Sequence, residues 1–127
     1  MGELASIYAG TVLTAELAVE METVGGTSAI DDDGLVIAIA GILPKWHGSG
    51  LAWAWLARGW RKHARAITAE IQRGLDATPI ERVEAAVRVD FERGHAWAKR
   101  LGFELETLAA RKWGADGATY SIYARVK

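Results

Sequence analysis

A group of basic residues at the start of a predicted helix carries the most specific chemistry in the sequence. The residues that form it are Arg58, Arg61, Lys62 and Arg65. No acidic residue follows them until Glu70. Because cations in the first turn of a helix oppose the helix dipole, each costs about 0.3 kcal/mol or more. A bound polyanion such as a phosphate would offset that cost, whereas the alternative interpretation is a solvated basic face that only aids solubility.

The composition and the placement of the histidines argue against a metal centre. The sequence has no cysteine, which excludes disulfides, thiolate metal ligands and a cysteine nucleophile. The three histidines are His47, His63 and His95, and they fall on separate predicted elements without the spacing of zinc ligands. We therefore expect no metal site.

The near-neutral net charge of −1 conceals two unlike halves. Residues 1–57 hold seven acidic residues and one basic residue, whereas residues 58–127 hold fourteen basic and nine acidic residues. The length of 127 residues predicts a single domain, 1–127, with a core of its own. Since no uncharged stretch reaches the roughly 20 residues that span a bilayer, and the N-terminus does not resemble a signal peptide, we expect a soluble intracellular protein.

The apolar spacing predicts a first helix and then a pair of strands. The helix covers residues 10–24, and the strands cover 27–30 and 35–43 with an acidic turn between them. Pro44 is expected to end the second strand, which makes 45–50 a loop. Residues 51–57 alternate large and small apolar side chains, which predicts a strand, but a helix from Leu51 is the alternative because alanine and leucine favour helices.

The second half of the sequence alternates helical and strand patterns. An apolar stripe predicts a helix of about 16 residues from Trp60, and period-2 alternation predicts a strand over 80–89. Asp90 is expected to cap a short helix that ends at Gly102 in a left-handed conformation. Residues 103–113 and 118–126 flank a glycine-containing turn, the pattern of a closing hairpin.

The order of these elements and the segment 80–103 resemble the GCN5-related N-acetyltransferase (GNAT) family. The end of the segment, Leu101-Gly102-Phe103-Glu104, matches a characteristic sequence of that family. The resemblance covers the chain from about residue 27 to the C-terminus and is closest to small acetyltransferase-like proteins encoded by tailed phages. It implies an α/β (α+β) fold with a mixed, mostly antiparallel sheet flanked by helices, shortened at the N-terminus.

The resemblance also implies a site for acetyl-CoA. In the family the fourth and fifth strands splay apart and the pantetheine arm pairs with backbone in the gap, while the pyrophosphate lies at the turn into the following helix. Here those strands are 51–57 and 80–89. The implied cofactor-binding residues are Ala54, Trp55, Leu56, Ala57, Arg58, Gly59, Trp60, Arg61, Lys62 and His63. The loop 45–50 reproduces the glycine spacing of the family's phosphate loop, and it becomes the alternative site if a helix starts at Leu51.

An acetyltransferase needs a base that takes a proton from the amine, directly or through water. Glu84, on the polar face of the strand over 80–89, is the best-placed candidate, followed by Tyr123 and His47. The other interpretation of Glu84 is an ion pair with Arg82 or Arg88 on the sheet surface.

The short helix departs from the family at two positions. Where the family commonly has an asparagine and a tyrosine, this sequence has Phe91 and Ala98. Both changes remove polar groups. The family's tyrosine can protonate the departing thiolate, and Ala98 cannot.

Two functions remain open from the sequence. The first is a phage-encoded acetyl-CoA-dependent N-acyltransferase, which positions a CoA thioester against an amine acceptor in the host cytoplasm. The second is a non-catalytic GNAT-fold protein that binds other phage proteins, in virion assembly or as an internal virion component. A nucleic-acid-binding module ranks third, because the basic residues would also suit a phosphate backbone.

Overall fold

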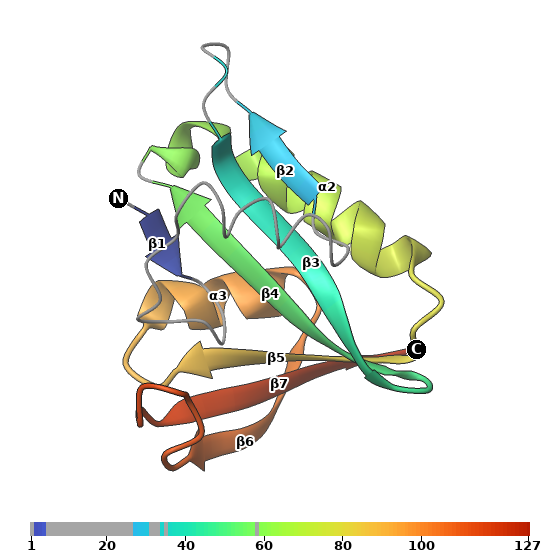
Figure 1. Cartoon of the computed structure of the whole chain (residues 1–127), viewed down its shortest axis with the longest axis vertical. Coiled ribbons are helices and arrows are strands. Elements are labelled where there is room, and N and C mark those ends of the chain that lie inside the picture. Colours follow the sequence, from blue (N-terminus) through green and yellow to red (C-terminus); the bar gives the residue numbers. More distant parts are fainter. Residues whose placement is uncertain (1, 5–26, 31–33, 35, 58) are drawn as a thin grey trace.

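The computed structural model describes residues 2–4, 27–30, 34, 36–57 and 59–127, and the structural statements that follow concern these residues. The predicted helix over 10–24 and most of the acidic turn lie outside them. The elements in chain order are β1 (Gly2–Leu4), β2 (Thr27–Ile30), β3 (Val36–Trp46), β4 (Ser49–Ala57), the 3-10 helix η1 (Trp60–His63), α2 (Ala64–Ala77), β5 (Arg82–Arg88), α3 (Glu92–Arg100), β6 (Glu104–Ala110) and β7 (Tyr120–Val126) (Figure 1).

The strands form one mixed sheet in the order β2-β3-β4-β5-β7-β6, and β1 pairs separately with β4. β4 and β5 run parallel, and the other paired strands are antiparallel. Figure 1 shows α2 and α3 on one face of this sheet, α2 behind β2 and β3, and α3 behind β4 and β5. The predicted fold, a mostly antiparallel mixed sheet flanked by helices, is therefore confirmed.

The hairpin between β3 and β4 is longer and tighter than predicted. β3 does not end at Pro44 but continues to Trp46, and only His47 and Gly48 form the turn. The prediction of a loop over 45–50 was wrong because proline is tolerated in a strand at a bulge, where it need not donate a ladder hydrogen bond. The pairing shifts register between Pro44 and Trp46, which leaves Lys45 as the bulged residue.

Residues 51–57 form a strand, as the alternation predicted, and not a helix. Eight residue pairs join β3 to β4, from Ala38↔Leu56 to Trp46↔Ser49. The tertiary pairing outweighs the local helix propensity of alanine and leucine.

Helix α2 packs through a narrow apolar stripe. Ile67 and Leu75 are buried, and Ile67 joins Ala38 and Leu56 in a core cluster between the helix and the sheet. Since β-strand side chains alternate between faces, Ala40, Ala52 and Ala54 face the helices together with Ala38 and Leu56. The sheet beneath α2 is therefore lined largely by alanine.

Helix α3 ends as predicted but begins differently. Gly102 has a φ of 92°, and the amide of Phe103 donates to the carbonyl of Ala98 at 3.0 Å, which closes the predicted left-handed cap. Asp90 is not the N-cap, because Phe91 occupies that position without a side-chain cap. The exposed Asp90 lies in the preceding turn, where its carboxylate is 3.5 Å from the Arg88 guanidinium.

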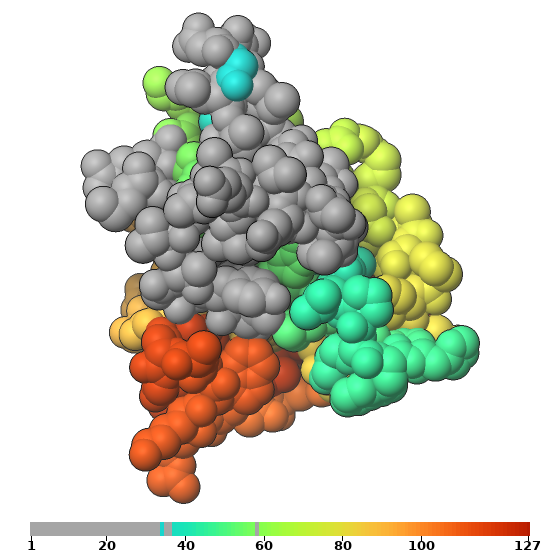
Figure 2. All heavy atoms as spheres, viewed as in Figure 1, coloured from blue at the N-terminus to red at the C-terminus, as the bar shows by residue number. Residues whose placement is uncertain are grey.

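The chain closes with the predicted β6–β7 hairpin. β7 lies between β5 and β6, and its tyrosines Tyr120 and Tyr123 are completely buried. β6 forms the free edge of the sheet, and the hairpin makes the lower left corner of the molecule in Figure 2. The positions 103–113 and 118–126 predicted for these strands extend beyond β6 and β7 into the connecting turn.

Candidate functional site

The parallel strands β4 and β5 pair only at one end. Three residue pairs join them, and the last is Leu51↔Glu84. Beyond this point, which we call the vertex, β4 has no further pairing with β5, although both strands continue. The separation agrees with the splayed strands implied by the family resemblance. At the far end of β4, β1 pairs with Trp55, Leu56 and Ala57.

The far end of β4 leads into the basic helix start. Gly59 has a φ of 86°, a left-handed conformation that turns the chain from β4 into η1. Arg61, Lys62 and Arg65 are exposed there, and neither η1 nor α2 has an acidic residue in its first turn. Arg58 lies outside the described residues. Positive side chains and the amides of a helix start therefore lie together at the end of the opening.

A cavity of about 910 Å³ lies between the helices and the sheet. It is lined by residues of β3, β4, β5, α2 and α3, and it includes Ala52 and Ala54 of β4 and Ala85 and Val87 of β5. These four residues flank the separation of the two strands. The cavity therefore adjoins the opening on the side of the helices, and its lining is mainly apolar.

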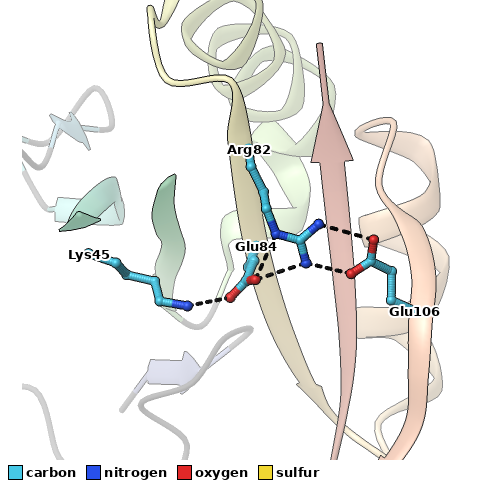
Figure 3. Close-up of polar contacts among 4 residues, drawn as sticks. All are labelled: Lys45, Arg82, Glu84 and Glu106. Carbon is cyan, nitrogen blue, oxygen red and sulfur yellow. Dashed lines mark hydrogen bonds and ion pairs between the residues drawn. The ribbon is translucent and has the colours of Figure 1, made fainter. Parts of the chain in front are cut away.

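Glu84 lies at the vertex as part of a chain of ion pairs (Figure 3). Lys45 Nζ is 2.7 Å from one of its carboxylate oxygens, and Arg82 Nε donates to the other at 2.9 Å. Arg82 also donates to Glu106 of β6 at 3.1 Å. Lys45 is the bulged residue of β3, and its side chain reaches Glu84, since a bulge redirects the side chain of its extra residue.

The electrostatics of this network keep Glu84 ionised. Burial by itself raises the pKa of the Glu84 carboxyl, but the hydrogen bonds from Lys45 and Arg82 outweigh burial and hold the pKa below its usual value. The pKa of Arg82 is raised, chiefly by its hydrogen bonds to Glu106 and Glu84. One of the two predicted ion-pair partners, Arg82, is therefore present, whereas Arg88 bonds to Asp116 at 2.8 Å.

Tyr123 lies on the opposite face of the sheet from Glu84. It pairs with Ala85 in the ladder between β5 and β7, and its hydroxyl is 2.7 Å from His95 Nδ1. His95 Nε2 is 3.1 Å from the Val89 carbonyl, which can only accept, so Nε2 carries the hydrogen and Nδ1 accepts from Tyr123. Burial raises the pKa of Tyr123, which keeps the hydroxyl protonated as the donor.

The structure does not bring the three candidate bases together. Glu84 is at the vertex, Tyr123 is bonded to α3 on the helix side, and His47 is exposed in the β3–β4 turn. Tyr123 is not among the described residues that line the cavity. The alternative phosphate loop at 45–50 required a helix that starts at Leu51. Residues 51–57 instead belong to the strand β4, and residues 45–50 lie at its start, whereas η1 follows its end.

The two family positions in α3 carry no polar side chain toward the cavity. Ala98 is buried in the core cluster and lines the cavity, while Phe91 is partly buried and contacts Gly94. Among the described residues, no group of three or more His, Cys, Asp or Glu side chains could hold a metal ion. In the same part of the chain, no helix is long and apolar enough to cross a membrane.

Sequence reasoning missed three parts of this arrangement. The predicted loop over 45–50 does not anticipate the contact between Lys45 and Glu84, and the local signal for a bulge there is Pro44. The pairing of β1 with β4 had no signal, because residues 2–4 are too few to show a period. The cavity had a weak signal in the alanines of 52–54, which alternate with larger residues.

Solved structures of several acetyltransferases are similar to this chain in fold. The ribosomal-protein-S5-alanine acetyltransferase from Vibrio fischeri superposes with a TM-score of 0.66 at 17% identity, over 87% of this chain and 66% of that protein. A variant of spermidine N-acetyltransferase SpeG from Vibrio cholerae gives 0.66 at 14% identity, over 80% and 64%. The microcin C7 self-immunity acetyltransferase MccE, solved with acetyl-CoA and AMP, gives 0.56 at 25% identity, over 72% and 55%.

These similarities establish that the chain has the fold of the GNAT acetyltransferases. The chain spans at most 66% of the length of these three proteins. No protein-family profile matches the sequence, and no curated protein is significantly similar to it.

Proposed function

We propose that the protein is an N-acyltransferase that binds a CoA thioester in the opening between β4 and β5 and transfers its acyl group to an amine. The observation that carries this proposal is the separation of β4 and β5 beyond Leu51 and Glu84, with the basic start of α2 at the other end of β4. The acetyltransferases of the same fold support it. The acceptor is an amine whose identity is open.

The phosphate end of the cofactor suits the start of α2. Lys62 and Arg65 are exposed cations beside the left-handed Gly59, and no carboxylate in the first turns competes for them. A pyrophosphate at this place would remove the unfavourable interaction between these cations and the helix dipole. His63 follows at the end of η1 and lines the cavity.

The proposed path of the pantetheine arm follows β4 from η1 toward the vertex. Trp55, Leu56 and Ala57 are the β4 residues nearest to the phosphate end, and β1 pairs with them. In the proposed function β1 leaves this edge when the thioester binds. The thioester end of the arm then lies toward the vertex, where Glu84 is found.

In the transfer the amine nitrogen bonds to the acyl carbon and the carbon–sulfur bond breaks, while the amine loses one proton and the thiolate gains one. When bound, the CoA thioester supplies the acyl group and a good leaving group. Glu84 is the proposed proton acceptor, because it is at the vertex and its carboxylate is ionised. Its lowered pKa makes it a weak base, so positioning of the two reactants supplies most of the rate.

The proposal is tested by titrating the purified protein with CoA while following tryptophan fluorescence and melting temperature. A ligand that binds only the folded state stabilises it by an amount that grows with concentration. We expect saturable binding and a rise in melting temperature. Absence of both at millimolar CoA would refute the acyltransferase proposal.

A second candidate is a non-catalytic GNAT-fold protein of a phage, which binds other phage proteins in virion assembly or inside the virion. The apolar Phe91 and Ala98 at the two polar positions of the family favour it, as does the use of Glu84 in ion pairs. This candidate predicts that the protein copurifies with particles and that CoA does not bind. Particles free of the protein would refute it.

A further inference from the structure

We propose that the cavity behind β4 receives the hydrocarbon chain of the acyl thioester, so that the donor carries a medium-length acyl group in place of acetyl. This inference rests on the proposed function and specifies its substrate class. The cavity has a volume of about 910 Å³, which is near the upper end of the range for whole small-molecule sites. An acetyl group has only two carbons.

The cavity extends well beyond the opening between β4 and β5. In the sheet order, β3 lies on the other side of β4 from β5, and yet Ala38, Ala40 and Ile42 of β3 line the cavity. A pantetheine arm in the opening therefore leaves the part over β3 unoccupied. The alanines of β3 and β4 keep this part open, because larger side chains there would fill it.

The space also passes beneath α2. Thr68 accepts a hydrogen bond from Trp97 of α3 and so marks the flank of α2 that faces α3. Ala66 and Arg73 lie on the opposite flank by helical geometry, and both line the cavity. Gly74, between these flanks, also lines the cavity, and it is exposed, as are Ala66 and Arg73. The cavity thus extends from the α3 side along α2 and opens to solvent at the edge of the helix away from α3.

The burial of the residues in and beside the cavity lining agrees with an apolar hollow between the sheet and its helices. Val83, Val87 and Leu75 are buried, but Ile42, Ile71 and Ala85, which pack against the same cluster, are only partly buried. Partial exposure of apolar side chains between a sheet and its helices means that their contacts are incomplete. A hydrocarbon chain would supply the missing contacts.

The chemistry of the lining selects a hydrocarbon over a polar ligand. Its charged residues are Glu70 and Arg73, which form an ion pair with each other on the exposed face of α2. The remaining polar side chains are His63 and Thr78, at opposite ends of the η1–α2 segment. The walls between them are alanine, isoleucine, leucine and other apolar residues, which an acyl chain matches and a peptide or sugar does not.

The test is a binding series with CoA, acetyl-CoA, butyryl-CoA and octanoyl-CoA, each below its critical micelle concentration, measured by calorimetry. Each buried methylene is expected to tighten binding about two- to fourfold, so octanoyl-CoA should bind on the order of 60-fold or more tighter than acetyl-CoA. Equal affinities across the series would overturn the cavity assignment and leave the acyltransferase proposal intact. Failure of every thioester to bind would overturn both.

Filling the cavity gives a second, independent test. Ala40→Leu narrows the space over β3 and should reduce the preference for octanoyl-CoA over CoA to less than about fivefold, with CoA affinity unchanged. Gly74→Leu, at the open rim of the cavity on α2, should do the same if Ala40→Leu fails to fold. The matched control is Ala69→Leu, because Ala69 is an exposed α2 residue outside the lining. A preference that survives both filling variants would overturn the proposal.

Discussion

Leu51 and Glu84 are the last residues through which β4 and β5 pair, and the Glu84 carboxylate is held there by Lys45 and Arg82. The point where the two strands begin to separate is thus also the point where an ionised carboxylate is fixed. This relationship connects the fold, which provides the opening, to the proton acceptor of the proposed acyl transfer.

The first prediction concerns the basic start of α2. Lys62→Ala combined with Arg65→Ala should weaken CoA binding about three- to thirtyfold, since each exposed charge contributes up to about 1 kcal/mol. The salt dependence of the affinity should fall as well. The control is Lys99→Ala with Arg100→Ala, which removes two exposed cations near the end of α3. An affinity that the first pair leaves unchanged would move the phosphate site away from α2.

The second prediction separates the two roles of Glu84. Glu84→Gln keeps the shape of the side chain but removes its charge, so acyl transfer at saturating thioester should fall about 100-fold or more if Glu84 accepts the proton. CoA affinity should stay within about twofold, because Glu84 lies at the other end of β4 from the proposed phosphate site. A turnover rate equal to that of the wild type would leave Glu84 with its ion-pair role alone.

The third prediction follows from the lowered pKa of Glu84. A carboxyl whose pKa is lower in the folded state stabilises the protein above its unfolded pKa of about 4.3, and this contribution is lost as the pH falls through the folded value. Urea unfolding between pH 7 and pH 3 should therefore show a steeper loss of stability below pH 4 in the wild type than in Glu84→Gln. Parallel curves would contradict the prediction.

The fourth prediction concerns the packing of α3 on β5. A Cβ at Gly94 would lie 2.6 Å from a Phe91 ring carbon and 2.7 Å from a Val87 methyl, so Gly94→Val should lower the free energy of unfolding by about 1–3 kcal/mol. Gly74→Ala is the matched helical control, where the added Cβ meets no atom within 4 Å. It should raise stability by up to about 1 kcal/mol. Calorimetric melting of both variants measures the difference.

The fifth prediction concerns β1. β1 pairs with the edge of β4 that the pantetheine arm is proposed to use. CoA can then bind only the molecules in which β1 has left this edge, so the apparent affinity is lowered in proportion to their fraction. Deletion of residues 2–4 should then tighten CoA binding by about threefold or more. Weaker binding after the deletion would instead make β1 a part of the site.

The sequence predicted the elements whose signals are local. Gly102 followed by Phe103 predicted the end of α3, because the left-handed glycine and the apolar residue after it are adjacent in the chain. The alternation in 51–57 predicted β4, although a helix remained the alternative until the pairing with β3 was known. Asp90 misled because good cap residues also occur in turns, where this one pairs with Arg88.

The site depended more on relationships between distant residues. The sequence by itself determined the basic start of α2 and the polar face of β5 that carries Glu84, since both are patterns within a single element. Only the tertiary structure decided that Lys45 reaches Glu84, that β1 lies against β4, and that the alanines of β3 and β4 border a cavity. The reason is that pairing, bulges and packing volume arise between segments, and the sequence of one segment does not specify the space that another leaves beside it.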